Sequence, residues 1–346
     1  MAVIAETLGV SVMTVSKVLR GQGRISQATR DRVRAEAARL GYHPNPHGVG
    51  LAKARQGGHG QGTLALLVGH RDANPLTAVP PHPLHYHYPR MVEGARARAA
   101  ELGYGLDIFW VYTPGLTARR LEVILQARAI NAVILMSVQR GAIEIDWSRY
   151  ACAYLGKPEG AGVAFSFADF FSVARLAFEK VHEAGYRRVG LVIDEVHHQL
   201  TEGRCLGGWA AAQTSCMGTE RVSALVLAGM AADDVKFRSW RNRERPDAIM
   251  FLRNNVPEWI WATCQREAGR IGLVDLDLRS ADRTAAGIWI PHERIGARGV
   301  DLVNEQLQHG QRGLLVDAPV TWLMGDWVDG GTLPPKKCLK IRVSGS

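Results

Sequence analysis

From residue 63 onward, short apolar runs alternate with amphipathic segments, and this alternation limits the possible folds more than any other feature. The apolar runs predict buried strands, and the segments between them have the period of helices. Alternating strands and helices form parallel sheets with helices on both faces. Such a pattern over about 280 residues exceeds a single core, so we expect an α/β body of two doubly wound parallel-sheet lobes. The expected strands are Leu64–Val68, Leu106–Val111, Ala132–Met136, Ala151–Leu155, Val189–Ile193, Ala224–Leu227, Ala248–Leu252 and Ile271–Leu276. The expected helices include Met91–Leu102, Thr117–Ala127, Phe171–Ala184, Glu258–Glu267 and Ile295–His309.

Composition and motifs exclude several classes of protein. The chain is 47% hydrophobic and 22% charged, as soluble globular proteins are. No apolar run approaches the ~20 residues that cross a bilayer, and residues 1–9 lack the pattern of a signal peptide, so we expect a cytoplasmic protein. The five cysteines form no C-x-x-C pair, and the spacing of His82, His85 and His87 fits no closed ligand set, so we expect no metal. No catalytic motif or cofactor loop is present, so we expect neither an enzyme nor a cofactor.

The first 60 residues form a basic unit with a helical pattern. They hold nine Lys or Arg and three acidic residues, a net charge of +6 against +3 for the remaining 286 residues. Apolar residues at helical spacing end at Gly9, and Ser11 is placed to cap a second helix. A third helix follows the capping residue Ser26 and ends at Gly41. The pattern predicts an all-α helix-turn-helix head that binds nucleic acid, although charge alone would equally suit a solvated basic helix.

In a helix-turn-helix the second helix enters the major groove. Val12 and Met13 begin this helix and can contact a thymine methyl group, unless they only pack inside the head. Lys17, one turn on, can donate to guanine O6 or N7. Hydroxyl groups and cations beside these positions suit phosphates. The phosphate candidates are Ser11, Thr14, Ser16 and Arg20.

The runs G-V-S-V-M-T-V-S at 9–16 and L-G-Y-H-P-N at 40–45 together resemble the head of the LacI/GalR transcription regulators. The resemblance implies a sequence-specific DNA-binding regulator, a repressor that binds a near-palindromic operator as a homodimer and is modulated by a small molecule. It divides the chain into a head (1–44), a hinge helix and linker (45–62), a two-lobed body (63–336) and a tail (337–346). The chain opens inside the family's first helix, so we expect either that the protein starts earlier than this sequence or that the helix lacks its usual cap, at a cost of about 1 kcal/mol.

The resemblance extends to the hinge segment after Pro44. It implies a short helix that folds on DNA, with Leu51 as the lever in the minor groove and with Asn45 and Lys53 as further DNA contacts. Gly48 and Gly50 each cost up to about 1 kcal/mol in a helix interior, so we expect a disordered free hinge. The alternative is that 45–62 serves only as a tether.

In the body the resemblance is carried by A-G-Y-R-R-V-G at 184–190, R-C-L-G-G-W at 204–209, P-D-A-I at 246–249 and V-D-L-D at 274–277. It implies lobes of periplasmic-binding-protein type, joined by crossovers near 158–162, 288–292 and 320–324. It also implies a sugar-like effector, such as a carbohydrate, between the lobes. The implied effector contacts are His87, Tyr88, Arg204, Asn254, Trp259 and Asp277.

Two departures from the family pattern change the expected pocket. H-Y-H-Y at 85–88 replaces a family loop, and Ser166-Phe167 stand near the place of an acidic residue after the fourth strand. Each polar candidate could also be a surface ion pair or a helix cap. The alternatives are therefore a regulator whose pocket no longer senses a ligand, a solute-binding protein, or a carbohydrate-acting α/β protein.

Overall fold

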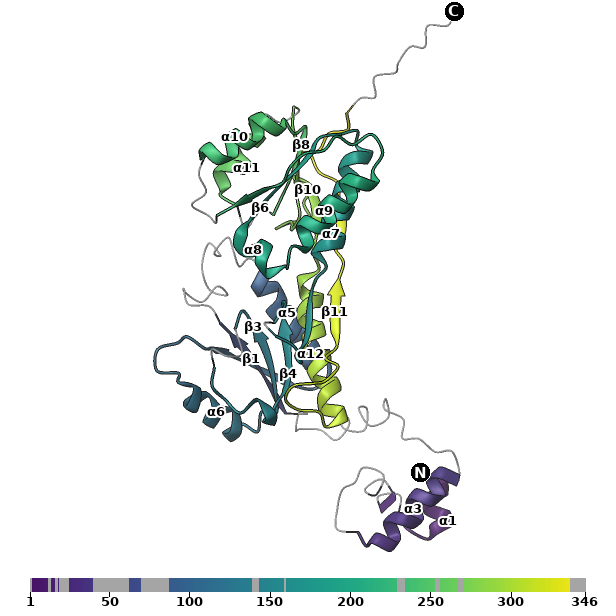
Figure 1. The fold of residues 1–346 in the computed structure, drawn as a ribbon. Coiled ribbons are helices and arrows are strands. Elements are labelled where there is room, and N and C mark those ends of the chain that lie inside the picture. Colours follow the sequence, from purple (N-terminus) through teal and green to yellow (C-terminus); the bar gives the residue numbers. More distant parts are fainter. Residues whose placement is uncertain are drawn as a thin grey trace, which may run out of the picture. The chain divides into compact units, whose positions relative to one another are not determined.

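The computed structural model describes residues 2–11, 14–15, 18, 25–39, 62–69, 87–138, 143–158, 160–228, 234–252, 256–266 and 270–336. The chain divides into two compact units, Met1–Gln61 and Gly62–Ser346 (Figure 1). Most of the predicted DNA contacts and one predicted effector contact lie outside the described residues. These are Val12, Met13, Ser16, Lys17, Arg20, Asn45, Leu51, Lys53 and Asn254.

The N-terminal unit contains α1 (Ala2–Leu8) and α3 (Gln27–Arg39). Gly9 ends α1 with φ +64°, a conformation that favours glycine. The Ser11 Oγ accepts the Thr14 N–H at 3.0 Å, and the Ser26 Oγ accepts the Thr29 N–H at 3.3 Å. Both predicted serine caps are therefore confirmed. The described buried side chains of this unit form one small core: Ile4, Ala5, Val15, Val18, Val33 and Ala37.

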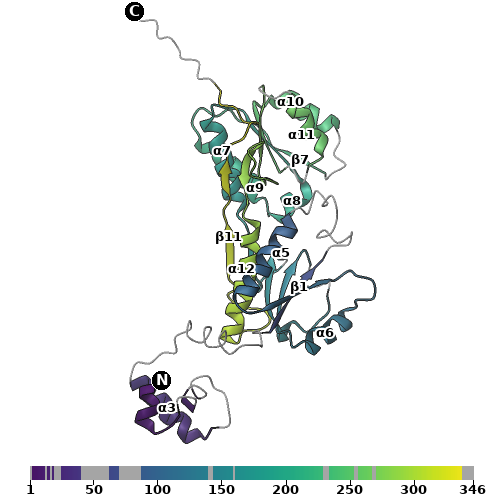
Figure 2. The ribbon, with the colours of Figure 1, turned by 180° about the vertical axis from the view of Figure 1, so that it is seen from behind.

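The first lobe of the body is a six-stranded parallel sheet in the order β11-β5-β4-β3-β1-β2. Its strands are β1 (Thr63–Val68), β2 (Gly105–Trp110), β3 (Ala132–Met136), β4 (Ala151–Leu155), β5 (Ala164–Ala168) and β11 (Val320–Leu323). Because side chains alternate along a strand, Leu64 and Leu66 join the core with α5 (His87–Glu101) and α12 (His292–His309). Ala65 and Leu67 face α6 (Ala118–Ala127), which Figure 2 shows on the other side of the sheet. A short 3₁₀ helix, η3 (Trp147–Arg149), precedes β4.

The second lobe has a sheet in the order β12-β10-β9-β8-β6-β7, parallel except for the β10–β12 pair. Its strands are β6 (Val189–Asp194), β7 (Leu225–Leu227), β8 (Ala248–Phe251), β9 (Gly272–Asp275), β10 (Ala286–Trp289) and β12 (Asp326–Val328). The helices on one face are α7 (Phe170–Glu183) and α9 (Arg204–Ser215), and those on the other are α10 (Asp234–Glu244) and α11 (Glu258–Gln265). The short α8 (Glu195–Leu200) follows β6 directly.

Two glycines allow α5 and α12 to pack in close contact. A Cβ atom at Gly94 would lie 1.9 Å from the Glu293 carbonyl oxygen, and one at Gly296 would lie 1.8 Å from the Met91 carbonyl oxygen. These distances are far below van der Waals contact, so any larger residue would force the helices apart. The N-terminus of α12 is thereby held against the N-terminal half of α5.

The predicted two-lobed α/β body is confirmed, but the first crossover was predicted in the wrong place. The chain leaves the first lobe at Asp169 rather than near 158–162, because the unpredicted strand β5 still belongs to the first sheet. The second crossover lies between β10 and α12, within the predicted range, and the third lies at 324–325, between β11 and β12. Ser166 lies inside β5, where its Oγ donates to the Ile295 carbonyl oxygen at 2.8 Å. None of the helices described is long and apolar enough to cross a membrane.

Candidate functional site

A polar cluster lies where the strands of both lobes end. On the side of the first lobe, the Tyr88 hydroxyl hydrogen-bonds the Ser137 hydroxyl directly after β3. Ser137 has φ +54°, a conformation that is uncommon for a residue with a side chain. Burial raises the pKa of Tyr88, while its hydrogen bond to Ser137 acts in the opposite direction. Tyr88 therefore supplies a neutral phenol at this position.

Histidines connect this edge to the second lobe. The His87 ring stacks on the His292 ring with centroids 5.0 Å apart. His292 begins α12, and its Nε2 lies 2.9 Å from Oδ1 of Asp277, which follows β9. His292 is 3% exposed and Asp277 is 5% exposed, so this contact is shielded from water. Side chains from α5, α12 and the second sheet thus meet at one place.

Asp194 and His197 extend the cluster along the end of β6. The Asp194 Oδ1 accepts the His197 backbone N–H at 2.9 Å and so caps α8. Burial raises the pKa of Asp194, although backbone N–H groups oppose the effect. Burial also lowers the pKa of His197 to about 4, with the Asp277 carboxylate acting in the opposite direction. The Phe170 ring packs edge-to-face on His197 with centroids 5.0 Å apart.

Arg204 contributes to the junction between the lobes. Its Nη2 donates to the Asp169 Oδ1 at 2.8 Å, and its guanidinium lies 4.1 Å from the centroid of the Trp322 ring. Burial raises the pKa of Asp169, but hydrogen bonds from Ser172 and Arg204 outweigh it and the net shift is downward. Because α9 belongs to the second lobe and β11 to the first sheet, Arg204 links the two lobes.

A second arginine has the same role at another crossover. The Arg90 Nε donates to the Glu293 Oε1 at 2.6 Å, and the guanidinium lies 3.8 Å from the centroid of the Trp289 ring. Arg90 lies on α5 in the first lobe, and Trp289 ends β10 in the second. The charges of both arginines are thus compensated by carboxylates within the hinge region.

The structure brings together three of the predicted effector residues, His87, Tyr88 and Asp277. Arg204 instead contacts Asp169 and Trp322 where the chain crosses between the lobes. Trp259 instead packs edge-to-face on Phe237 of α10, 5.8 Å between centroids, in the apolar layer of the second lobe. The sequence analysis missed further members of the cluster: Ser137, Phe170, Asp194, His197 and His292. Asp194 could have been found, because it directly follows the predicted strand Val189–Ile193 at the edge where ligands bind in such sheets.

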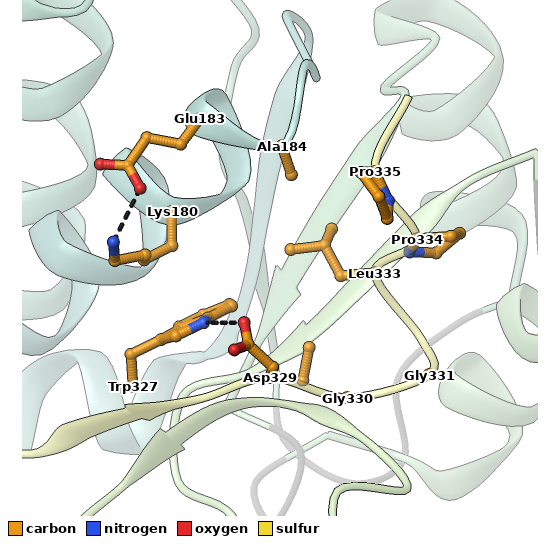
Figure 3. A pocket seen from close by; sticks show the side chains of 11 residues that line it. Lys180, Glu183, Ala184, Trp327, Asp329, Gly330, Gly331, Leu333, Pro334 and Pro335 are labelled. Atoms are coloured by element: carbon orange, nitrogen blue, oxygen red, sulfur yellow. Dashed lines mark hydrogen bonds and ion pairs between the residues drawn. The ribbon is translucent and has the colours of Figure 1, made fainter. Parts of the chain in front are cut away.

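A hollow lies away from this cluster, in the second lobe (Figure 3). It has a volume of about 630 Å³ and lies between the end of α7, β12 and the segment 329–335. Lys180 donates to Glu183 at 2.7 Å and the Trp327 Nε1 donates to Asp329 at 2.7 Å, so its polar groups are paired with one another. The hollow therefore offers a ligand fewer polar groups for hydrogen bonding than the cluster does. Across the described ranges, no three His, Cys, Asp or Glu side chains are placed to hold a metal ion.

A small helical N-terminal unit and a two-lobed α/β body also occur together in solved structures of transcription regulators. Residues 1–45 match the family model "Bacterial regulatory proteins, lacI family". The chain is 27% identical over 241 residues to the transcriptional regulator CelR of Thermobifida fusca, covering 67% of this chain and 62% of CelR. It is 31% identical over 212 residues to the lactose operon repressor of Escherichia coli strain K12, covering 60% of this chain and 54% of that repressor. The N-terminal 45 residues therefore match the LacI family model, and the rest of the chain resembles relatives that are transcription regulators. The match spans less than two thirds of each of these relatives.

Solved structures show the same fold. The CelR–cellobiose complex aligns with a TM-score of 0.57 at 19% identity, over 95% of this chain and 98% of that one. The Lac repressor dimer bound to operator and the anti-inducer ONPF aligns with a TM-score of 0.53 at 20% identity, over 96% and 98%. The fold of the two-lobed, periplasmic-binding-protein-like body is therefore also found in solved structures.

Proposed function

We propose that this protein is a DNA-binding transcription regulator, a repressor, that acts as a homodimer in the cytoplasm. Two copies of the head read the two halves of a near-palindromic operator, with Ser11 and Thr14 at phosphates and Lys17 at a base edge. Two relatives support this proposal, since one is named a lactose operon repressor and one solved neighbour is a repressor dimer on its operator.

The effector in this proposal is a small, sugar-like molecule bound at the polar cluster between the lobes. The observation that carries it is the cluster itself, because His87 and Tyr88 belong to α5 while Asp194, His197 and Asp277 belong to the second lobe. A ligand that contacts both sides changes the relative stability of different lobe arrangements. The neighbour solved with cellobiose supports a saccharide as the ligand.

Regulation follows from linkage between the two sites. If the ligand favours one lobe arrangement and operator DNA favours another, each lowers the affinity for the other by the same factor; if both favour one arrangement, each raises it. Changes of 5- to 150-fold, about 1–3 kcal/mol, are typical of such coupling. No catalytic step enters this proposal.

Selection of bound fragments from random DNA tests the head. The full chain is incubated with the pool at near-physiological salt, because affinity without a stated salt concentration has no meaning for DNA. We expect a near-palindromic consensus with a deformable central step. Binding that depends on salt but not on sequence would contradict the proposal.

A further inference from the structure

An ion pair joins a loop of the first lobe to a loop of the second. The Lys157 ammonium, two residues after the end of β4, contacts the Glu202 carboxylate, which lies between α8 and α9. Figure 1 shows α8 on the side of the second lobe that faces the first lobe. The Lys157 side chain is 26% exposed and that of Glu202 is 61% exposed, so the pair is partly in contact with solvent. A contact of this kind breaks when the lobes move apart.

The backbone of the second lobe fixes the position of Glu202. Glu202 has φ +50°, a conformation that is uncommon for a residue with a side chain and persists only where the surrounding structure holds it. Its N–H donates to the Gln199 carbonyl oxygen at 2.9 Å, and the next N–H, that of Gly203, donates to the His198 carbonyl oxygen at 2.9 Å. The turn therefore presents the Glu202 carboxylate at a defined place.

The backbone of the first lobe fixes the position of Lys157 in a similar way. Gly156, the residue before it, has φ +110°, a conformation that favours glycine. The Gly156 N–H donates to the carbonyl oxygen of Ser166 on β5 at 2.9 Å. Lys157 thus leaves the sheet from a backbone that is held between β4 and β5. Both partners of the ion pair are positioned before their side chains meet.

A second Lys–Glu pair shows what distinguishes the first. Lys180 contacts Glu183 within α7, and these side chains are 35% and 63% exposed. The residue types and the exposure resemble those of the pair between the lobes. The α7 pair, however, keeps its geometry in every arrangement of the lobes, because both residues belong to one helix. Only a pair with one partner on each lobe changes the relative stability of the arrangements.

We infer that the Lys157–Glu202 pair is a latch that stabilises the lobe arrangement of this structure and so sets how readily the lobes move apart. Its effect on regulation rests on the proposed function, in which ligand and operator DNA each favour one arrangement. Water and salt screen both charges, so the contribution of such a pair is modest. We expect a factor of about 1.5 to 5 in the equilibrium between lobe arrangements.

A double-mutant cycle of charge reversals tests whether the contact is made in solution. Lys157→Glu and Glu202→Lys each place like charges together, whereas the double variant restores an opposite-charge pair. In urea unfolding of the full chain at about 0.05 M NaCl, the folding equilibrium constant of the double variant should be about 2- to 5-fold higher than the two single effects multiplied together predict. The difference should shrink at about 0.5 M NaCl, because salt screens exposed charges. Single effects that simply multiply at both salt concentrations would overturn the inference.

The Kd for the selected operator tests the effect of the latch on lobe arrangement. The reference ligand is whichever of cellobiose, D-glucose and lactose raises the unfolding temperature of the wild type most. A ligand that contacts both lobes favours their approach, so each single reversal should shift the operator Kd about 1.5- to 5-fold in the direction opposite to that ligand. The double reversal should return the Kd toward the wild-type value. Lys180→Glu and Glu183→Lys, the same reversals in the α7 pair, should leave the operator Kd at the wild-type value.

The two measurements separate failure of the latch from failure of the proposed function. Single reversals that leave the operator Kd unchanged, or that shift it no differently from the α7 reversals, would overturn the inference. Failure of the wild type to bind a specific operator, or to respond to any of the three saccharides, would count against the proposed function instead. The urea cycle uses neither DNA nor ligand, so it would still decide whether the ion pair holds the lobes together.

Discussion

The neutral state of His197 predicts that the body loses stability as the pH falls. The ordinary pKa of 6.5 applies to the unfolded chain, whereas burial lowers the native value to about 4. Between these values the unfolded chain binds a proton that the native side chain does not, so stability falls with decreasing pH. The stability that neutral His197 contributes is complete above pH 6.5 and is lost as the pH drops toward 4. At about 1.4 kcal/mol per pH unit, the full effect is about 3 kcal/mol.

Urea unfolding followed by tryptophan fluorescence measures this effect. All nine tryptophans lie beyond residue 100, so the signal reports the body. Between pH 7.5 and 4.5, wild type should lose about 2–3 kcal/mol more than His197→Gln does. His309→Gln removes an exposed histidine at the end of α12 and should keep the wild-type pH dependence. Burial raises the pKa of Asp194, so this group makes stability increase as the pH falls, opposite to His197. Asp194 is present in wild type and in both variants, so its contribution cancels in the comparison.

Equal pH dependence in wild type and His197→Gln would refute this reasoning. It would mean that native His197 takes up its proton near pH 6.5, as an exposed imidazole does.

Three further changes have defined outcomes. Gly296→Ala should lower the free energy of unfolding of the body, measured in urea, by about 1–3 kcal/mol, because the new Cβ would meet the Met91 carbonyl oxygen. Gly207→Ala on α9 should be tolerated, because the atom nearest to its Cβ would be 3.6 Å away. Equal stability of the two variants would argue against the close contact between α5 and α12. Ser11→Ala should weaken the head by about 1 kcal/mol, seen as about fivefold faster amide exchange in residues 2–39, and unchanged exchange would show that the cap contributes nothing. Lys17→Ala should relax base preference at one position per half-site, and a uniform loss of affinity would make Lys17 a phosphate contact instead.

The two-lobed body could be predicted from the sequence because its central strands are apolar on both faces. Leu64–Val68 and Ala132–Met136 were placed almost to the residue, since such runs fit only the middle of a covered parallel sheet. The shorter strands β10, β11 and β12 at the crossovers were missed. Each has three or four residues, and their pairing is decided by segments distant in the chain.

The polar cluster could be predicted only in part. Motif resemblance identified Asp277, and the run H-Y-H-Y at 85–88, in the place of a family loop, identified His87 and Tyr88. His292 and Phe170 follow strands that were not predicted, so nothing marked the edge at which they lie. His197 lies one turn beyond Asp194 and becomes part of the cluster only because β6 and β9 end at the same edge. For Arg204, the sequence could not show that Asp169 and Trp322 occupy its guanidinium.

The central claim is that ligand and DNA are coupled through this chain. The most direct measurement is the Kd for the selected operator with and without a saturating amount of the saccharide that stabilises the wild type most. We expect the operator Kd to change at least fivefold, and the saccharide Kd to change by the same factor when it is measured with and without operator. An operator Kd that does not change with ligand would contradict the claim, and the chain would then be a DNA-binding protein that does not sense the molecule it binds.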